Sequence, residues 1–237
     1  MRNIVQNIPH SSTAGVFDPV IGKWPRNPHL LMNGIGKLTD LYTDFLFATD
    51  TEGVSSVVFP YSRFVCDAER LDDDPMEKIG QGIIYTNFGA VERGNLDKDA
   101  VDAILGLRAG HLRKLSEGLT EGSVLIDCHS FTPDDDGMAD ICVGYNDDWS
   151  YDKRVVEAVV SGFRNRGYTV SENVPFSNSI TPPSEHKYAS VMIEVNKRLY
   201  MDASFTSLSF DTMKAARWFG TLDAIREKIL HLPLEAV

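Results

Sequence analysis

The chain alternates short apolar runs with longer segments whose apolar residues recur at helical spacing. The predicted strands cover residues 4–8, 54–59, 123–127, 140–143, 168–170 and 190–195, and the predicted helices cover 30–47, 97–119, 151–166 and 211–229. Val124, Leu125 and Ile126 form a continuous apolar run, which is typical of a strand buried on both faces. This alternation predicts an α/β protein in which helices cover a largely parallel sheet.

Length and charge limit the domain count and the classes of partner. The 237 residues fit one domain with a full α/β core, and we assign residues 1–237 to it. Asp and Glu number 34 against 23 for Lys and Arg, which gives a formal net charge of −11. Because such a surface repels phosphate backbones, we do not expect nucleic-acid binding. The sequence is compatible with a homo-oligomer.

The cysteines and the hydropathy indicate a compartment. Cys66, Cys128 and Cys142 lack the spacing of a disulfide framework or a zinc knuckle, so we interpret them as reduced, buried thiols. We find no signal-peptide pattern and no apolar run near the ~20 residues that a bilayer span requires. We therefore expect a cytoplasmic protein that does not bind membranes.

Two histidines stand where predicted strands end. His10 follows the first strand and His129 follows the central one, with Asp127 two residues earlier. Ligands of open α/β sheets bind beyond the carboxyl ends of the strands, and histidine is the commonest metal ligand. The pair therefore indicates a metal site, although either histidine alone would more often be a satisfied core or loop residue. His111 has no such context and is interpreted as structural.

Glu194 is the one carboxylate inside an apolar strand. Its neighbours on both sides predict burial, and a carboxylate is rarely buried without a partner. It is either a structural ion pair with Lys197 or Arg198, or a general base whose pKa is tuned by its surroundings.

A turn-rich segment from 60 to 94 carries the second polar cluster. Loops of that length in a compact domain are usually functional. Within it, Arg63 and Arg70 flank Asp67 and Glu69. Arginine suits a bidentate grip on a substrate carboxylate, but the same residues also fit an internal salt-bridge network. Tyr200 is a candidate hydrogen-bond donor to an oxyanion, or a core residue with its hydroxyl bonded.

These stretches together resemble the N-formylglutamate amidohydrolase family, which is distantly similar to the zinc carboxypeptidases and to succinylglutamate desuccinylase and aspartoacylase. The resemblance is carried by residues 8–11, 62–70, 82–86, 126–131, 140–144 and 192–202. It implies a three-layer α/β/α sandwich with a mixed, largely parallel central sheet. It also implies hydrolysis of N-formyl-L-glutamate to formate and L-glutamate, and associates the chain with amino-acid metabolism and histidine degradation.

The resemblance also implies roles for individual residues. One zinc ion would be held by His10 and His129, but Thr13 stands where the wider group has its glutamate ligand. A catalytic zinc normally has three protein ligands, so we take Asp40 as the third, with Glu69 as its competitor.

The remaining implied roles concern catalysis and substrate binding. Glu194 matches the base that deprotonates the metal-bound water, Asp67 the carboxylate that orients His10, and Arg63 a residue that polarises the carbonyl; Tyr200 completes the catalytic set. The predicted substrate-binding residues are Arg63, Arg70, Glu69, Ser130 and Arg198.

Two other functions fit the same residues. One is a related zinc amidohydrolase or carboxypeptidase that acts on another N-acyl amino acid, a γ-glutamyl compound or a cell-wall peptide. The other is a non-catalytic binding module on the same fold, which the missing third ligand allows.

Overall fold

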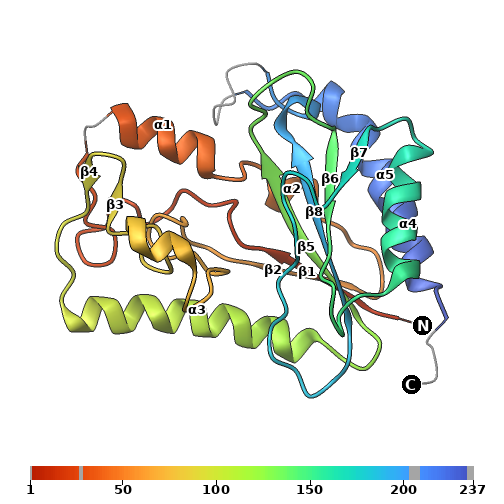
Figure 1. Ribbon diagram of the computed structural model, residues 1–237, viewed down its shortest axis with the longest axis horizontal. Helices are drawn as coiled ribbons and strands as arrows, with labels where there is room; N and C mark the ends of the chain where they lie inside the picture. Colours follow the sequence, from red (N-terminus) through yellow and green to blue (C-terminus); the bar gives the residue numbers. More distant parts are fainter. Residues whose placement is uncertain (1, 27–28, 203–208, 234–237) are drawn as a thin grey trace.

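A six-stranded sheet runs through the middle of the molecule, with helices on both faces (Figure 1). The computed structural model describes residues 2–26, 29–202 and 209–233. The sheet strands are β1 (Ile4–Ile8), β2 (Val54–Val58), β5 (Val124–Phe131), β6 (Ile141–Gly144), β7 (Val170–Glu172) and β8 (Ala189–Asn196). The helices are α1 (His29–Leu38), α2 (Thr43–Leu46), α3 (Lys98–Gly118), α4 (Lys153–Arg164) and α5 (Thr212–Leu230).

The sheet is mixed, as the resemblance implied. Its order is β2-β1-β5-β8-β6-β7, and the four strands from β2 to β8 are mutually parallel. β6 is antiparallel to β8 and parallel to β7. The three-layer α/β/α architecture is therefore confirmed, and the carboxyl ends of β1, β5 and β8 meet at one edge.

One face of the sheet is covered by α4 and α5. Alternate residues of the central strands, such as Ile126, Cys128 and Ile193, belong to the large apolar cluster under these helices. Gly162 of α4 allows the close approach, because a Cβ there would lie 2.4 Å from the side chain of Ile225 in α5. This face of β5 and β8 is mainly apolar core, with Ser130 as a buried polar residue near the end of β5.

The opposite face of the sheet is covered by α3. Asp97 begins this helix as its N-cap, accepting a hydrogen bond from the backbone N–H of Ala100 at 2.9 Å. Leu115 packs with Val5 and Leu125 in a separate apolar cluster. Because side chains alternate along a strand, residues 127 and 129 of β5 share this face with Leu125.

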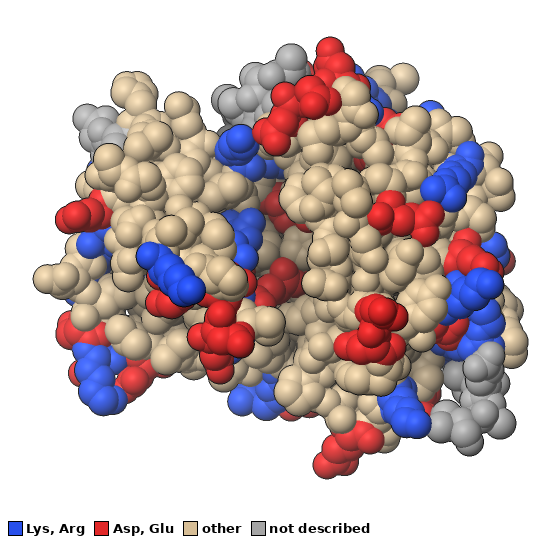
Figure 2. Space-filling model, viewed as in Figure 1, with Lys and Arg blue, Asp and Glu red and all other residues tan. Residues whose placement is uncertain are grey.

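The segment from 60 to 94 folds beside the carboxyl edge of the sheet. It contains a 3-10 helix (Pro75–Ile79) and the hairpin β3 (Asn87–Phe88) and β4 (Val91–Glu92). α1 lies against this hairpin, and Gly34 allows it because a Cβ there would meet the Phe88 ring. Figure 2 shows a groove between this lobe and the sheet, with acidic and basic side chains in its floor.

The predicted helix over 30–47 is wrong in one respect, because the structure breaks it after Leu38. Residues 39–42 turn instead, with Tyr42 at a φ of 67°. The backbone N–H of Asp40 donates to the carbonyl of His10 at 2.9 Å, and Thr43 donates to the carbonyl of Asp40. A continuous helix would forgo these tertiary bonds, so the break fixes Asp40 next to His10.

Two strands also extend beyond their predicted ends. β5 continues to Phe131 and β8 to Asn196, paired along all eight residues from Val124–Ala189 to Phe131–Asn196. His129 therefore lies within its strand rather than after it. The strand predicted at 168–170 begins later, at Val170, where it pairs with Ile141. In the part of the chain that the structure describes, no helix is both apolar and long enough for a bilayer span.

Candidate active site

The strand register places His129 beside Glu194. They are paired positions of the parallel strands β5 and β8, so both side chains lie on the face opposite Cys128 and Ile193. Both are largely buried, Glu194 being 9% exposed. His129 and Glu194 are therefore a polar pair within two largely apolar strands, and their side chains point away from the apolar core under α4 and α5.

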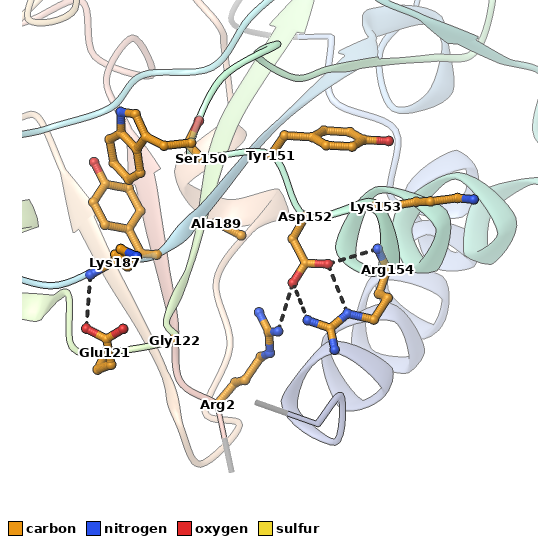
Figure 3. A pocket seen from close by; sticks show the side chains of 12 residues that line it. Arg2, Glu121, Gly122, Ser150, Tyr151, Asp152, Lys153, Arg154, Lys187 and Ala189 are labelled. Carbon is orange, nitrogen blue, oxygen red and sulfur yellow. Dashed lines mark hydrogen bonds and ion pairs between the residues drawn. The ribbon is translucent and has the colours of Figure 1, made fainter. Parts of the chain in front are cut away.

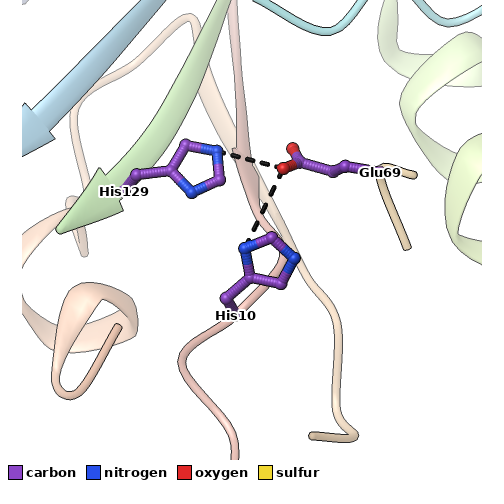
Figure 4. A group of neighbouring side chains, drawn as sticks. All are labelled: His10, Glu69 and His129. Carbon is purple, nitrogen blue, oxygen red and sulfur yellow. Dashed lines mark ion pairs between the residues drawn. The ribbon is translucent and has the colours of Figure 1, made fainter. Parts of the chain in front are cut away.

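His10 and Glu69 join His129 in a group of three ligand atoms within 4.8 Å of one another (Figure 4). Glu69 comes from the 60–94 segment, and its Oε2 lies 3.1 Å from His129 Nε2 and 3.9 Å from His10 Nδ1. A tetrahedral zinc with bonds near 2.05 Å needs ligand atoms about 3.3 Å apart. The spacing and the donor types therefore fit a zinc ion.

The second nitrogen of each imidazole faces a buried aspartate. His10 Nε2 lies 2.9 Å from Asp67 Oδ1, and His129 Nδ1 lies 3.0 Å from Asp40 Oδ2. Metal-binding histidines usually donate their other N–H to a carboxylate, which fixes the tautomer and the ring orientation. Both rings show that arrangement. Their other nitrogens, His10 Nδ1 and His129 Nε2, face Glu69 Oε2, and His129 Nε2 also lies 3.1 Å from Asp127 Oδ1.

The charges in the site strongly perturb one another. Burial by itself lowers the pKa of His129, but Glu69 and Asp127 outweigh it and hold that pKa well above its usual value. Burial raises the pKa of Asp67, yet Arg63 and His10 bring it well below the ordinary range. Burial, reinforced by Asp127, raises the pKa of Glu69 to about 7.

Within the described part of the chain, neither Lys197 nor Arg198 forms the structural ion pair with Glu194 that the sequence allowed. Lys197 donates instead to the carbonyls of Lys37 and Thr39 and to Thr132 Oγ1, at 2.8–3.1 Å. Arg198 pairs with Asp140 at 3.0 Å, in the loop before β6. Burial raises the pKa of Glu194 to about 8.

Several buried polar atoms at this site make no hydrogen bond within the described chain. They are His10 Nδ1, Glu194 Oε2 and Ser130 Oγ. Buried polar atoms are normally paired, so His10 Nδ1 and Glu194 Oε2 point to a ligand that satisfies them, whereas Ser130 lies on the face of β5 opposite His129.

The two predicted arginines lie around one carboxylate. Arg63 donates to Asp67 Oδ2 at 2.8 Å and to the carbonyl of Leu38 at 3.1 Å. Arg70 Nε lies 3.4 Å from the same Oδ2, and its Nη1 lies 3.3 Å from Asp74. The structure thus shows the internal salt-bridge network, in which two guanidinium groups share Asp67. The predicted binding of a substrate carboxylate would use the same two arginines.

Tyr200, predicted to donate to an oxyanion, is fully buried, and its hydroxyl donates to the carbonyl of Leu41 at 3.0 Å. Two further predicted substrate-binding residues are Arg198 and Ser130. Arg198 forms an ion pair with Asp140, and Ser130 directly follows His129 in β5.

Three polar residues that touch the site lie outside the predicted set of catalytic, substrate-binding and metal-binding residues. Asn7 bonds Glu69 and Asp127, Asp127 Oδ1 lies 3.1 Å from His129 Nε2, and Lys197 holds the turn before Asp40. Strand periodicity was a usable signal for Asp127, because residues i and i+2 of a strand share a face. The role of Lys197 depends on a turn that the sequence does not reveal.

Carboxylates outnumber the lysine and arginine side chains at the site. The carboxylates are Asp40, Asp67, Glu69, Asp127 and Glu194, and the basic groups around them are Arg63, Arg70 and Lys197. Burial raises the pKa of Glu69 and of Glu194, and the positive charge of a bound cation would favour the ionised form of both.

A second hollow lies at the opposite edge of the sheet (Figure 3). Its wall includes Arg2 before β1, Gly122 before β5 and Ala189 at the start of β8. Arg2 and Arg154 share the carboxylate of Asp152, at 2.8 and 2.9 Å. This hollow therefore lies at the amino ends of the strands, away from the histidine pair.

Comparison with known proteins identifies solved structures with the same fold and one matching family model. A crystal structure of N-formylglutamate amidohydrolase from Ralstonia eutropha JMP134 has a TM-score of 0.74 and 19% identity, covering 98% of this chain and 94% of that one. A gene product of Agrobacterium tumefaciens has a TM-score of 0.58 and 17% identity, covering 96% and 88%. These structures show the same fold. No curated protein matches the chain.

The fold and the family match define the class as an amidohydrolase. More particularly, the chain belongs to the N-formylglutamate amidohydrolase family, whose model matches residues 3–201.

Proposed function

We propose that this protein hydrolyses N-formyl-L-glutamate to formate and L-glutamate, with one zinc ion bound by His10, Glu69 and His129. The observation that carries the proposal is this donor group beside the buried Glu194, in a chain of the N-formylglutamate amidohydrolase family. Two imidazoles and one carboxylate are a ligand set of catalytic zinc sites that keep an open position.

The geometry favours Glu69 over Asp40 as the third ligand. Glu69 Oε2 lies 3.9 Å from His10 Nδ1 and 3.1 Å from His129 Nε2, and it forms the ligand group with both rings. Asp40 Oδ2 lies 3.8 Å from His10 Nδ1, but it is 3.0 Å from the other nitrogen of His129, Nδ1. Asp40 and Asp67 then have matching roles, each orienting one imidazole.

The chain's own residues supply the proton transfers. Zinc, when bound, lowers the pKa of a bound water toward ~7 and polarises the scissile carbonyl. Glu194 accepts the proton of the attacking water at Oε2, the buried atom that lacks a hydrogen-bond partner. It then donates this proton to the leaving nitrogen as the C–N bond breaks, which releases formate and the free amino group.

Substrate binding falls to the arginines around Asp67. Arg63 and Arg70 both pair with Asp67, and Arg70 also lies 3.3 Å from Asp74, so a substrate carboxylate would bind through guanidinium N–H groups that these aspartates leave unused. Arg70 is the better candidate for direct contact, because its side chain is 25% exposed against 17% for Arg63. Arg63 is further held by the Leu38 carbonyl and fixes Asp67.

Substitution of Glu194 by Gln tests the mechanism. We expect kcat to fall at least 10²-fold, since general-base catalysis contributes about 10²–10⁴-fold, while the zinc content is unchanged. Glu117→Gln, at an exposed position of α3, is the matched control and should leave kcat unaltered. Near-normal turnover of the Glu194→Gln enzyme would contradict the assignment.

The substrate is tested by measuring product release from a panel of N-formyl and N-acyl acidic amino acids, γ-glutamyl compounds and cell-wall peptides. We expect the highest kcat/KM for N-formyl-L-glutamate. Preference for another member would instead support a related amidohydrolase or carboxypeptidase. A chain that takes up no zinc and gains no thermal stability from it would be a binding module.

A further inference from the structure

Asn7 of β1 connects two carboxylates of the site. Its side chain is fully buried, and its Nδ2 donates to Glu69 Oε1 and, at 2.9 Å, to Asp127 Oδ1. Both partners are acceptors when ionised, so the amide nitrogen must face them. The orientation of this amide is therefore fixed by its partners, and its carbonyl oxygen must point the other way.

The carbonyl oxygen of Asn7 meets a histidine from α3. His111 Nε2 lies 2.7 Å from Asn7 Oδ1, and the His111 ring packs edge-on against Phe59 with centroids 5.3 Å apart. A carbonyl oxygen can only accept, so the proton must be on Nε2 of His111. Burial lowers the pKa of His111 to about 4, which leaves the ring neutral at pH 7, with its single N–H directed at Asn7.

This arrangement prevents one specific error. If the Asn7 amide rotated by half a turn, its carbonyl oxygen would face the oxygens of Glu69 and Asp127, and its NH₂ would face His111. The N–H on Nε2 of His111 would then oppose another donor, and relieving this clash would require the ring proton to move to Nδ1. We call the His111–Asn7 hydrogen bond the latch, because it supports the amide orientation that the two carboxylates set and so helps to keep an N–H donor on Glu69.

We propose that His111 is a positioning residue for the hydrolysis, acting through Asn7 to hold Glu69 in the geometry that binds zinc. This inference rests on the proposed function, because it assigns Glu69 as a ligand. The proposed role connects α3, which runs along the bottom of Figure 1, to the group of His10, Glu69 and His129 at the carboxyl edge of the sheet. Outer partners of metal ligands typically change metal affinity 10–100-fold when they are lost.

The test compares His111→Phe, His111→Gln and the control His231→Phe, whose histidine is exposed at the end of α5. Zinc affinity is measured by competition with a chromogenic chelator, and kcat/KM with N-formyl-L-glutamate. We expect His111→Phe to lose about 10-fold in zinc affinity and a similar factor in kcat/KM. His111→Gln retains an N–H donor and should recover most of both, and the control should be unchanged.

A folded His111→Phe protein with unaltered zinc affinity would overturn the inference and leave the proposed function standing. An unaltered chain that binds no zinc would overturn both. If His111→Phe does not fold, nitrogen NMR of the unaltered protein decides. We expect a neutral His111 protonated at Nε2, and protonation at Nδ1 instead would disprove the latch.

Discussion

At the scale of single residues, the site depends on which nitrogen of each imidazole a carboxylate contacts. A neutral ring has one donor nitrogen and one acceptor nitrogen, and a metal takes the acceptor. Asp40 and Asp67 lie 3.0 and 2.9 Å from the nitrogens that point away from the metal group. Glu69 lies on the other side of both rings.

This asymmetry predicts different consequences for two isosteric substitutions. Glu69→Gln removes a charged ligand and should lower zinc affinity by more than the roughly 10–100-fold that an outer partner contributes. Asp40→Asn keeps an acceptor for His129 Nδ1 and should stay within that range. Chelator competition on both proteins measures the difference, and the reverse order would restore Asp40 as the ligand.

The sequence was informative about residues inside strands and much less so about residues in turns. Glu194 stands out in the sequence because its neighbours in the strand are apolar, and their hydropathy predicts that the carboxylate is buried with them. The sequence could not decide between Asp40 and Glu69 as the third metal ligand, because both residues lie in irregular segments whose positions are set by tertiary contacts. His111 looked structural because Asn7, the polar partner that the described residues give it, lies 104 positions away.

At the scale of elements, the break between α1 and α2 is what brings Asp40 to the site. Apolar spacing over 30–47 favours a continuous helix, but tertiary bonds outweigh that local preference. Lys197, fully buried just after β8, donates to the carbonyls of Lys37 and Thr39, which an intact helix would have used internally. A single buried ammonium thus stabilises the turn that carries Asp40.

Replacing this lysine should therefore loosen one element rather than the whole fold. Lys197→Met keeps the apolar stem but leaves the two carbonyls without their donor, at a cost of about 1–3 kcal/mol. We expect faster amide hydrogen exchange over residues 37–43 and reduced kcat. Lys37→Met, at a side chain 61% exposed, is the control. Unchanged exchange in the Lys197 variant would show that the turn is stable without it.

At the scale of the whole molecule, the sheet separates two kinds of interior. Its α4–α5 face is mainly apolar, with one buried hydrogen-bonded pair, Arg226 and Gln6. Its α3 face turns from apolar at Leu125 to polar at Asp127 and His129. The polar half is held by ion pairs and hydrogen bonds that depend on protonation. Stability of the whole fold is therefore linked to the pH through this face.

His111 allows this link to be measured on one group. Its pKa is lowered from 6.5 to about 4, first by burial and then by His10, with Asp127 opposing and Lys114 adding to the effect. Between these values the unfolded chain binds a proton that the folded chain does not, so stability falls as the pH drops below 6.5. Above pH 6.5 both states are neutral and the contribution is complete.

His111→Gln removes this titration while keeping the N–H donor to Asn7. Between pH 7 and 4.5 the unaltered protein should lose about 2–3 kcal/mol more of its free energy of unfolding than the variant does. Urea unfolding of both proteins at the two pH values, with a chelator present so that metal release does not contribute, gives the difference. Parallel losses in the two proteins would mean that His111 is not held neutral, and the tautomer on which the latch depends would lose its support.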